Sequence, residues 1–350
     1  MAIPKIPREM FEGKQNPPWE RGVAYFQPYY NYNATISSWE PVTIHQTNTA
    51  FPSFESKFRL ITWNIDCLVP YAPERMTSAL AYLHTLYCSS TEKVIVMLQE
   101  MLTGDISLIL STPWIQKYFL VSDISAEFWE SDFYGTITLI DKRFAATSQG
   151  IGGIERIFRV HYPNTSMHRD ALFVDIAFPN RTRDREGSLL VRLGNTHLES
   201  LVSNPPKRPS QLSLAADYMR SSSEGEKLPR PHGAALAGDL NAFSLEDFTA
   251  PAEAGLQDVY LVLGGKEHSE NGYTWGQQIP EEVRKTFGYS RMDKVLFCGG
   301  LKAERIRRIG EGVTASVPKE QKGKVWVTDH LGLEVDFTVV AAGKEDTAIL

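Results

Sequence analysis

The chain has 350 residues, of which 42% are hydrophobic and 22% charged, so its composition supports a folded core and excludes wholesale disorder. With 36 Lys and Arg against 42 Asp and Glu, the formal net charge is −6, which argues against nucleic-acid binding driven mainly by bulk positive charge. No apolar run reaches the roughly 18 residues that a membrane span needs. The 3 cysteines are too few for a disulfide scaffold or a tetrahedral zinc cage. We therefore expect an intracellular protein without a membrane contact or a disulfide-linked partner.

The first part of the chain differs in texture from the rest. Residues 1–57 are rich in Pro, Asn and aromatic residues and lack sustained helical or strand periodicity. They contain too many aromatic residues for a solvated tail, so we expect an arm that packs on the main body. We expect one domain over residues 58–338, a short tail over residues 339–350, and a monomer.

Short apolar runs separated by polar turns begin at Phe58 and are typical of strands. Eight such runs are FRLITW, KVIVML, YGTITLI, ALFVDIAF, LLVRLG, AALAG, KVLF and LGLEVDF. Amphipathic helices are expected at residues 74–87 and 210–220, and an exposed loop at 221–233. So many strands with so few helices do not fit strict βαβ alternation. Two packed mixed sheets flanked by helices fit better.

Polar residues follow or begin several of these strands, where side chains can converge over a sheet edge. Taken singly, a strand-terminal Asn or Asp is usually a turn former or a helix cap. Taken together, the set offers hard oxygen ligands for a divalent cation, and carboxylates and imidazoles for proton transfer. Its oxygen-rich chemistry favours magnesium, with manganese as the alternative, over zinc. The residues concerned are Asn64, Asp66, Glu100, Asn195, His197, Asp239, Asn241, Asp293, Asp329 and His330.

The ordered motifs resemble those of the endonuclease/exonuclease/phosphatase superfamily of metal-dependent phosphoesterases. They are TWNID, LQE, NTHLES, GDLN, RMDKV and TDH, between about Phe58 and Phe337. Within that superfamily, the pairing of WNID with HLES, the YTW at 273–275 and the SMHR at 166–169 are most similar to the tyrosyl-DNA phosphodiesterase 2 group. The resemblance implies a four-layer α/β sandwich over residues 58–338, with two mixed β-sheets packed face to face and helices on the outside. It also implies that these residues form the catalytic domain.

The resemblance implies a role for each matching residue. Glu100 matches the principal magnesium ligand, and Asn64 beside it would hold a phosphate oxygen or metal-bound water. Asp239 would orient or deprotonate the attacking water, and Asn241 would fix the same water or the phosphate. His330 would donate to the phosphate as charge builds on its oxygens.

Two further carboxylates are expected to orient imidazoles. Asp329 would act on His330 and could also reach the metal, whereas Asp293 would act on His197. Asp66 would brace the turn at Asn64.

Three residues are candidates for substrate binding, each with a plainer alternative. Tyr134 could contact phosphate or be a core aromatic residue on a strand. Arg169 could contact the DNA backbone or an end phosphate, or be a surface charge. Trp275 could stack on a nucleobase or pack under a loop.

The leading functional hypothesis is a magnesium-dependent phosphodiesterase that removes tyrosine or peptide from the 5′ DNA ends left by trapped topoisomerase. Such a DNA-repair role implies the nucleus, although a cytoplasmic location stays open. The alternatives are another phosphoesterase of the superfamily (a nuclease, a deadenylase or a small-molecule phosphatase) and a non-catalytic binding protein. Two departures bear on this choice: Ala242-Phe243 replaces a Leu-Arg pair that touches DNA, and the arm lacks any resemblance to a ubiquitin-binding domain.

Overall fold

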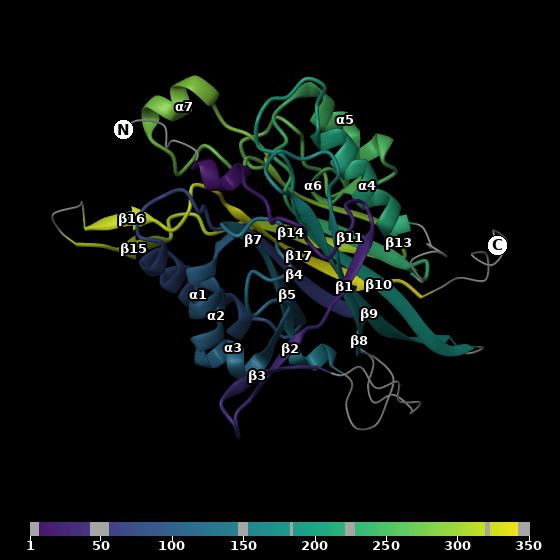
Figure 1. Cartoon of the computed structure of the whole chain (residues 1–350). Coiled ribbons are helices and arrows are strands. Elements are labelled where there is room, and N and C mark those ends of the chain that lie inside the picture. The colour runs from purple at the N-terminus through teal and green to yellow at the C-terminus, as the bar shows by residue number, and fades with distance from the viewer. Residues whose placement is uncertain are drawn as a thin grey trace.

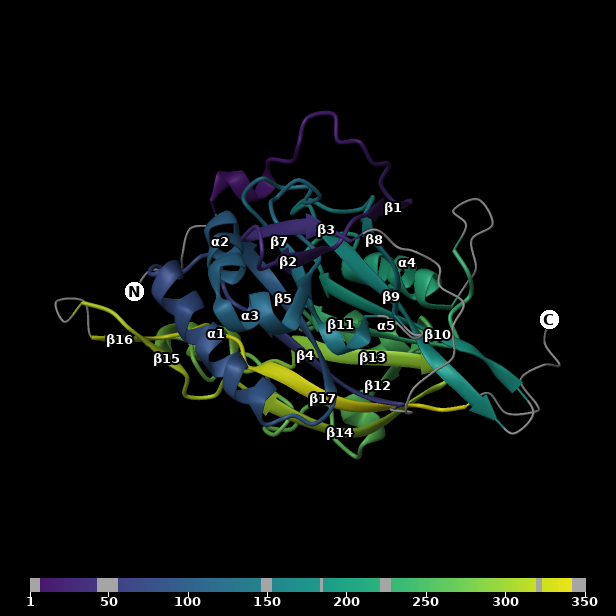
Figure 2. The same cartoon turned by 90° about the horizontal axis from the view of Figure 1, so that it is seen from below.

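The computed structural model describes residues 7–42, 56–145, 153–182, 185–220, 228–318 and 323–341. Two large mixed sheets form its centre (Figures 1 and 2). The eight-stranded sheet has the order β14 (Leu301–Ile309), β17 (Gly332–Val339), β4 (Lys57–Asn64), β5 (Lys93–Leu102), β7 (Tyr134–Asp141), β6 (Phe119–Val121), β2 (Tyr30–Asn33) and β3 (Ser38–Pro41). The seven-stranded sheet has the order β1 (Ala24–Gln27), β8 (Gly153–His161), β9 (Asp170–Thr182), β10 (Arg185–His197), β11 (Gly233–Asp239), β13 (Asp293–Gly299) and β12 (Gln257–Asp258).

Helices cover the outer face of each sheet. Figures 1 and 2 show α1 (Ala72–Cys88), α2 (Thr103–Ser111) and α3 (Pro113–Tyr118) against the eight-stranded sheet. On the other sheet lie α4 (Arg208–Arg220) and α5 (Leu245–Glu253), whereas Val259 of the short α6 (Val259–Val262) belongs to the core between the sheets. Helix α7 (Glu281–Phe287), the hairpin β15 (Thr314–Ser316) and β16 (Lys324–Trp326), and the 3₁₀ helices η1 (Arg8–Phe11) and η2 (Lys142–Phe144) complete the described elements. None of the described helices is long and apolar enough to cross a membrane.

Strand alternation explains the layers. In β4, Phe58 and Leu60 point into the core between the sheets, whereas Ile61 and Trp63 belong to the core under α1. A third core lies between the seven-stranded sheet and α4, around Phe173. Three buried layers between four layers of structure confirm the predicted four-layer α/β sandwich.

The N-terminal residues form three short strands that the sequence pattern did not indicate. Strand β1 pairs with β8 at the edge of one sheet, and β2 and β3 extend an edge of the other. We predicted an arm that packs on the main body in this region, and we predicted no particular strand within it. Its pattern was hidden because these strands have four residues each and their buried positions include Gln27 and Tyr30. Of the predicted tail, residues 342–350 lie outside the described residues.

Each large sheet contains one parallel pair, β4 with β5 and β10 with β11. The carboxyl ends of these pairs carry Asn64, Glu100, His197 and Asp239. Strands β13 and β17 run antiparallel to β11 and β4, so their amino ends reach the same edge. The topology thus gathers the polar strand ends of both sheets in one place.

Candidate active site

A bulge in β5 aims Glu100 into the site. Strand β5 pairs Leu98 with Ile137 and Met101 with Gly135, so one extra residue is inserted between them. Glu100 has a φ of +57°, in the left-handed region. As a result Gln99 points between the sheets, where its amide donates to Asn195 Oδ1 at 2.8 Å, and Glu100 points to the sheet edge. A left-handed backbone conformation costs energy at a residue other than glycine, and such residues concentrate at functional sites.

The loop after β4 holds the Glu100 carboxylate. Its Oε2 accepts from the backbone N–H of Cys67 at 2.9 Å and from the Cys67 thiol at 3.1 Å. Its Oε1 accepts from Asn64 Nδ2 at 3.3 Å, and the Asn64 oxygen accepts from the N–H of Asp66 at 2.8 Å. Donors from the end of β4 and from the loop after it therefore hold both oxygens of the Glu100 carboxylate.

Asp239 lies at the centre of the cluster. Its Oδ2 accepts from Asn64 Nδ2 at 2.9 Å, and its Oδ1 accepts from the N–H of Asn241 at 2.8 Å. Burial raises the pKa of Asp239, and the nearby Asp293 adds to this rise, while the charge of His330 opposes it. Gly238 before it has a φ of +150°, and a Cβ there would meet the carbonyl oxygen of Thr196, so only glycine fits.

His330 and Asp293 form a buried pair. Nδ1 of His330 lies 2.8 Å from Asp293 Oδ2, and its Nε2 lies 3.7 Å from Asp239 Oδ2. Burial alone would lower the pKa of His330, but the charges of Asp293, Asp239 and Asp329 outweigh it and raise the pKa well above its ordinary value. His330 is thus held as an imidazolium.

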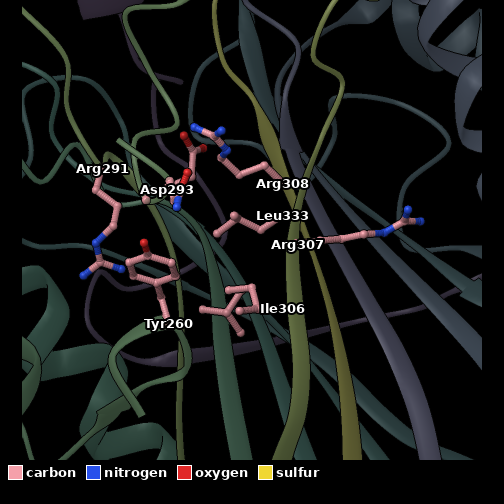
Figure 3. A pocket seen from close by; sticks show the side chains of 10 residues that line it. Tyr260, Arg291, Asp293, Ile306, Arg307, Arg308 and Leu333 are labelled. Carbon is pink, nitrogen blue, oxygen red and sulfur yellow. The ribbon is translucent and has the colours of Figure 1, made fainter. Parts of the chain in front are cut away.

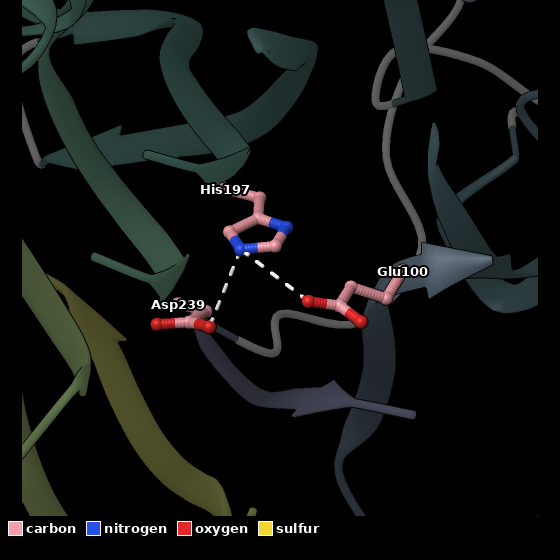
Figure 4. A group of neighbouring side chains, drawn as sticks. All are labelled: Glu100, His197 and Asp239. Carbon is pink, nitrogen blue, oxygen red and sulfur yellow. Dashed lines mark ion pairs between the residues drawn. The ribbon is translucent and has the colours of Figure 1, made fainter. Parts of the chain in front are cut away.

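The predicted pairing of Asp293 with His197 is wrong. His197 instead meets Arg169, whose Nη1 lies 2.5 Å from the His197 Nδ1. Asp293 begins β13 and His330 lies two residues before β17, and these two strands belong to different sheets, so linear order does not show that the two side chains meet. His197 faces Asp239 and Glu100 through its Nε2, at 3.4 and 3.7 Å (Figure 4).

Asp329 lies at the rim of the site. Its Oδ2 accepts from the indole N–H of Trp275 at 2.7 Å, and its Oδ1 lies 3.8 Å from Nε2 of His330. The expected orientation of His330 is therefore provided by Asp293 rather than by Asp329. Trp275 is half-buried, and its N–H is used by this contact.

The other two substrate-binding candidates are buried. The Tyr134 hydroxyl donates to the carbonyl oxygen of Met167 at 2.5 Å. Arg169 is 2% exposed, so the alternative that it is a surface charge is wrong. Their contacts with a substrate stay predictions.

A positioning residue was missed by the sequence analysis. Arg75 in α1 is 1% exposed, and its guanidinium donates to five backbone carbonyls. Four of them belong to the loop after β4 and one to Val327; the full set is Ile65, Asp66, Val69, Pro70 and Val327. The sequence could have indicated Arg75, because it lies one helical turn before Ala79, on the face of α1 whose apolar residues are buried.

The side chains present suit a hard divalent cation. Burial raises the pKa of Asp66 well above its ordinary value, and repulsion from Asp329 and Glu100 raises it further. Asp66, Asp329 and Glu100 are thus three neighbouring carboxyl groups, and such a set provides ligands for a cation that prefers oxygen. Glu100, His197 and Asp239 also bring one potential ligand atom each within 4.8 Å of the others.

A small cavity lies behind Asp293 rather than at the carboxylates. Its volume is about 60 Å³, and Tyr260, Arg291 and Leu333 line it together with Asp293 (Figure 3). It has room for water molecules but not for a nucleotide.

Comparison with known proteins assigns the chain to one family. The profile of the Endonuclease/Exonuclease/phosphatase family matches residues 61–330, which contain all the strand-end residues described above. The chain belongs to this family. Tyrosyl-DNA phosphodiesterase 2 of Xenopus laevis is 23% identical over 309 residues, which cover 86% of this chain and 72% of that protein.

Solved structures give the same fold. A humanized D. rerio TDP2 with 14 mutations superposes with a TM-score of 0.58 at 20% identity, over 81% of this chain and 100% of that one. The D. rerio TDP2 bound to a single-strand DNA product has a TM-score of 0.56 at 20% identity, again over 81% and 100%. The predicted resemblance to the tyrosyl-DNA phosphodiesterase 2 group is confirmed.

Proposed function

We propose that the chain is a magnesium-dependent phosphodiesterase that hydrolyses the bond between a 5′ DNA phosphate and a tyrosine or peptide. The observation that carries the proposal is the convergence of Glu100, Asp239 and the His330–Asp293 pair at one sheet edge. Manganese could replace magnesium, since both prefer oxygen ligands. Removal of such adducts would make the chain a DNA-repair enzyme, which we expect to act in the nucleus as a monomer.

The cation would be held by Glu100, with Asn64 and Asp329 beside it. When bound, it would neutralise charge on the phosphate and on the leaving oxygen. Cys67 and Asn64 preorganise the Glu100 carboxylate through hydrogen bonds that are already made. The amide of Asn64 adds no negative charge that would repel an anionic substrate.

Asp239 and His330 would do the remaining chemistry. A raised pKa makes the Asp239 carboxylate a better base toward the attacking water. The backbone N–H of Asn241 fixes the orientation of this carboxylate. As an imidazolium, His330 can donate to a phosphate oxygen when charge develops there, and Asp293 holds the ring in place.

A polymeric substrate is supported by the surface beside the site. Leu201 and Val202 follow the strand that carries His197 and are 45% and 80% exposed. Leu245, 82% exposed, follows the strand that carries Asp239. Arg208 joins these two loops by donating to the carbonyl of Leu201 and the hydroxyl of Ser244. Exposed apolar side chains suit the faces of nucleobases better than they suit a small, fully charged phosphate ester.

A second candidate is a phosphoesterase of the same family that acts on unmodified strands or small molecules. The observation that favours it is the Ala242-Phe243 pair, because Phe243 packs under the Arg208 guanidinium at 4.1 Å and cannot reproduce an arginine–DNA contact. A non-catalytic binding role is disfavoured, since the six motifs retain their reactive residues.

The test is a comparison of three substrates with and without magnesium. These are a 5′-phosphotyrosyl oligonucleotide, the same oligonucleotide without tyrosine, and a chromogenic phosphodiester. Release of tyrosine as the fastest magnesium-dependent reaction would support the proposal. Faster cleavage of the unmodified strand or the chromogenic ester would replace it by the second candidate.

A further inference from the structure

Arg169 lies buried between the chain turn before β9 and the end of β10. Its Nη1 is 2.5 Å from His197 Nδ1, and its Nη2 is 2.5 Å from Ser200 Oγ. The guanidinium carbon lies 5.0 Å from the centre of the Tyr134 ring. Two hydrogen bonds and an aromatic face therefore fix the guanidinium against His197.

The chemistry of arginine determines where the His197 proton is. A guanidinium only donates hydrogen bonds and is not deprotonated in proteins. Nδ1 of His197 must therefore offer its lone pair to Arg169 and carry no proton. In a neutral imidazole, the single proton is then on Nε2.

The surroundings of Nε2 agree with this assignment. The nearest charged groups are the acceptor oxygens Asp239 Oδ2, at 3.4 Å, and Glu100 Oε1, at 3.7 Å (Figure 4). The contact of Nδ1 with the donor-only guanidinium also excludes the doubly protonated ring, so the ring is neutral. Nε2 is buried and makes no hydrogen bond within the described residues, which leaves a free donor aimed into the site.

We propose that Arg169 is a positioning residue that locks His197 as its Nε2–H tautomer, so that the ring presents a hydrogen-bond donor to the site and does not bind the metal. The consequence for turnover rests on the proposed function, whereas the tautomer does not. The two site imidazoles are then set in opposite ways. Asp293 stabilises the charged ring of His330, and Arg169 stabilises the neutral ring of His197.

The tautomer can be read directly by NMR on the full chain with ¹⁵N-labelled histidine. A two-bond ¹H–¹⁵N correlation identifies the protonated ring nitrogen, and the His197→Gln spectrum assigns the His197 signals. We expect a protonated Nε2 and a bare Nδ1, both unchanged when magnesium is added. A protonated Nδ1, or loss of the Nε2 proton on addition of magnesium, would overturn the proposal without using any substrate.

Variants of Arg169 test the lock itself. Arg169→Met removes every donor at similar length and should allow the Nδ1–H tautomer, with kcat lower by about 10²-fold, the usual loss for one transition-state donor. Arg169→Lys keeps a donor-only cation and should retain the Nε2–H tautomer. Arg220→Met is the control, at an arginine that is 42% exposed and paired with Asp217. It should change neither the His197 tautomer nor kcat. An unchanged His197 tautomer in folded Arg169→Met would overturn the proposal.

If no phosphoester tested is cleaved by the wild-type chain, the proposed function fails while the NMR result still decides the tautomer. If the wild-type chain is active and Arg169→Met changes the tautomer but not kcat, the donor role of His197 fails alone.

Discussion

At the scale of single residues, the site depends on neighbours that move ordinary side chains away from their usual protonation states. Burial acts on Asp239, His197 and His330 alike, but the charges beside them differ. Carboxylates raise the pKa of His330, whereas Arg169 and His330 lower the pKa of His197. Two histidines of one site are thus prepared for different tasks.

The sharpest residue-scale expectation concerns Asp239 and His330. Asp239→Asn should lower kcat by roughly 10²–10⁴-fold, because an amide cannot accept the proton of the attacking water. His330→Ala should lower it by about 10²–10³-fold through loss of a donor to the phosphate. Turnover and melting temperature should be measured on the same preparations. Near-normal turnover in folded Asp239→Asn protein would show that Asp239 is only a turn residue.

Asp293 should control the pH range of activity. The raised pKa of His330 keeps its ring charged above pH 6.5, so the stability that the pair contributes is full below about pH 6.5 and is lost as pH rises through the folded-state pKa. Asp293→Asn removes the charge that raises the pKa of His330 most. The alkaline fall of kcat should therefore move to lower pH in Asp293→Asn. A kcat–pH profile with the same alkaline limb as wild type would refute the role of the pair.

The sequence could predict which residues are reactive but not which of them meet. Asn64, Glu100, Asp239 and His330 occur in motifs whose order is recognisable, and the structure brings them together. Partner choice depends on which strand ends are neighbours in space. The Asp293–His330 contact joins the start of β13 to a residue two positions before β17, so the sequence alone favoured the wrong partner, His197.

At the scale of elements, apolar runs predicted the central strands, but strands with a charged face were not predicted. Strand β14 reads LKAERIRRI, and its Arg305 and Arg307 pair with Glu334 of β17. Such a strand has too few apolar positions for the pattern to stand out. The bulge at Glu100 likewise cannot be recognised in the apolar run KVIVMLQEML, although it is the bulge that turns the Glu100 side chain into the site.

The N-terminal element η1 should support the site through Met10. Met10 is 2% exposed and packs with Cys67 and Tyr134. Cys67 donates to Glu100, and the Tyr134 ring lies against Arg169. Met10→Ala should lower the free energy of unfolding by roughly 2 kcal/mol or more and expose the Cys67 thiol, which is 8% exposed in the native fold.

The matched control for Met10 is its neighbour. Phe11→Ala, at a side chain that is 42% exposed, should change the free energy of unfolding by only about 0.5 kcal/mol. Denaturant unfolding and the rate of Cys67 alkylation are the two measurements. Equal effects of the two variants on both would show that η1 does not support the site.

At the scale of the whole molecule, the chain places a carboxylate-rich site in a protein of net charge −6. An anionic phosphodiester is repelled by Asp66, Glu100, Asp239 and Asp329 unless a cation is present. The two-sheet architecture was predictable because the family motifs follow strand ends in a fixed order. The edge strands β1, β2 and β3 were not, because short half-buried strands leave a weak pattern.

The most direct test of the central claim is the rate of tyrosine release from a 5′-phosphotyrosyl oligonucleotide as magnesium is titrated. The wild-type chain should show a rate that rises with magnesium to saturation and is lost with a chelator. Glu100→Gln keeps the size of the side chain but not its charge, so magnesium should produce no rise. Glu311→Gln, at a carboxylate that is 66% exposed, should behave as wild type. Magnesium-stimulated release by folded Glu100→Gln at the wild-type rate would contradict the account.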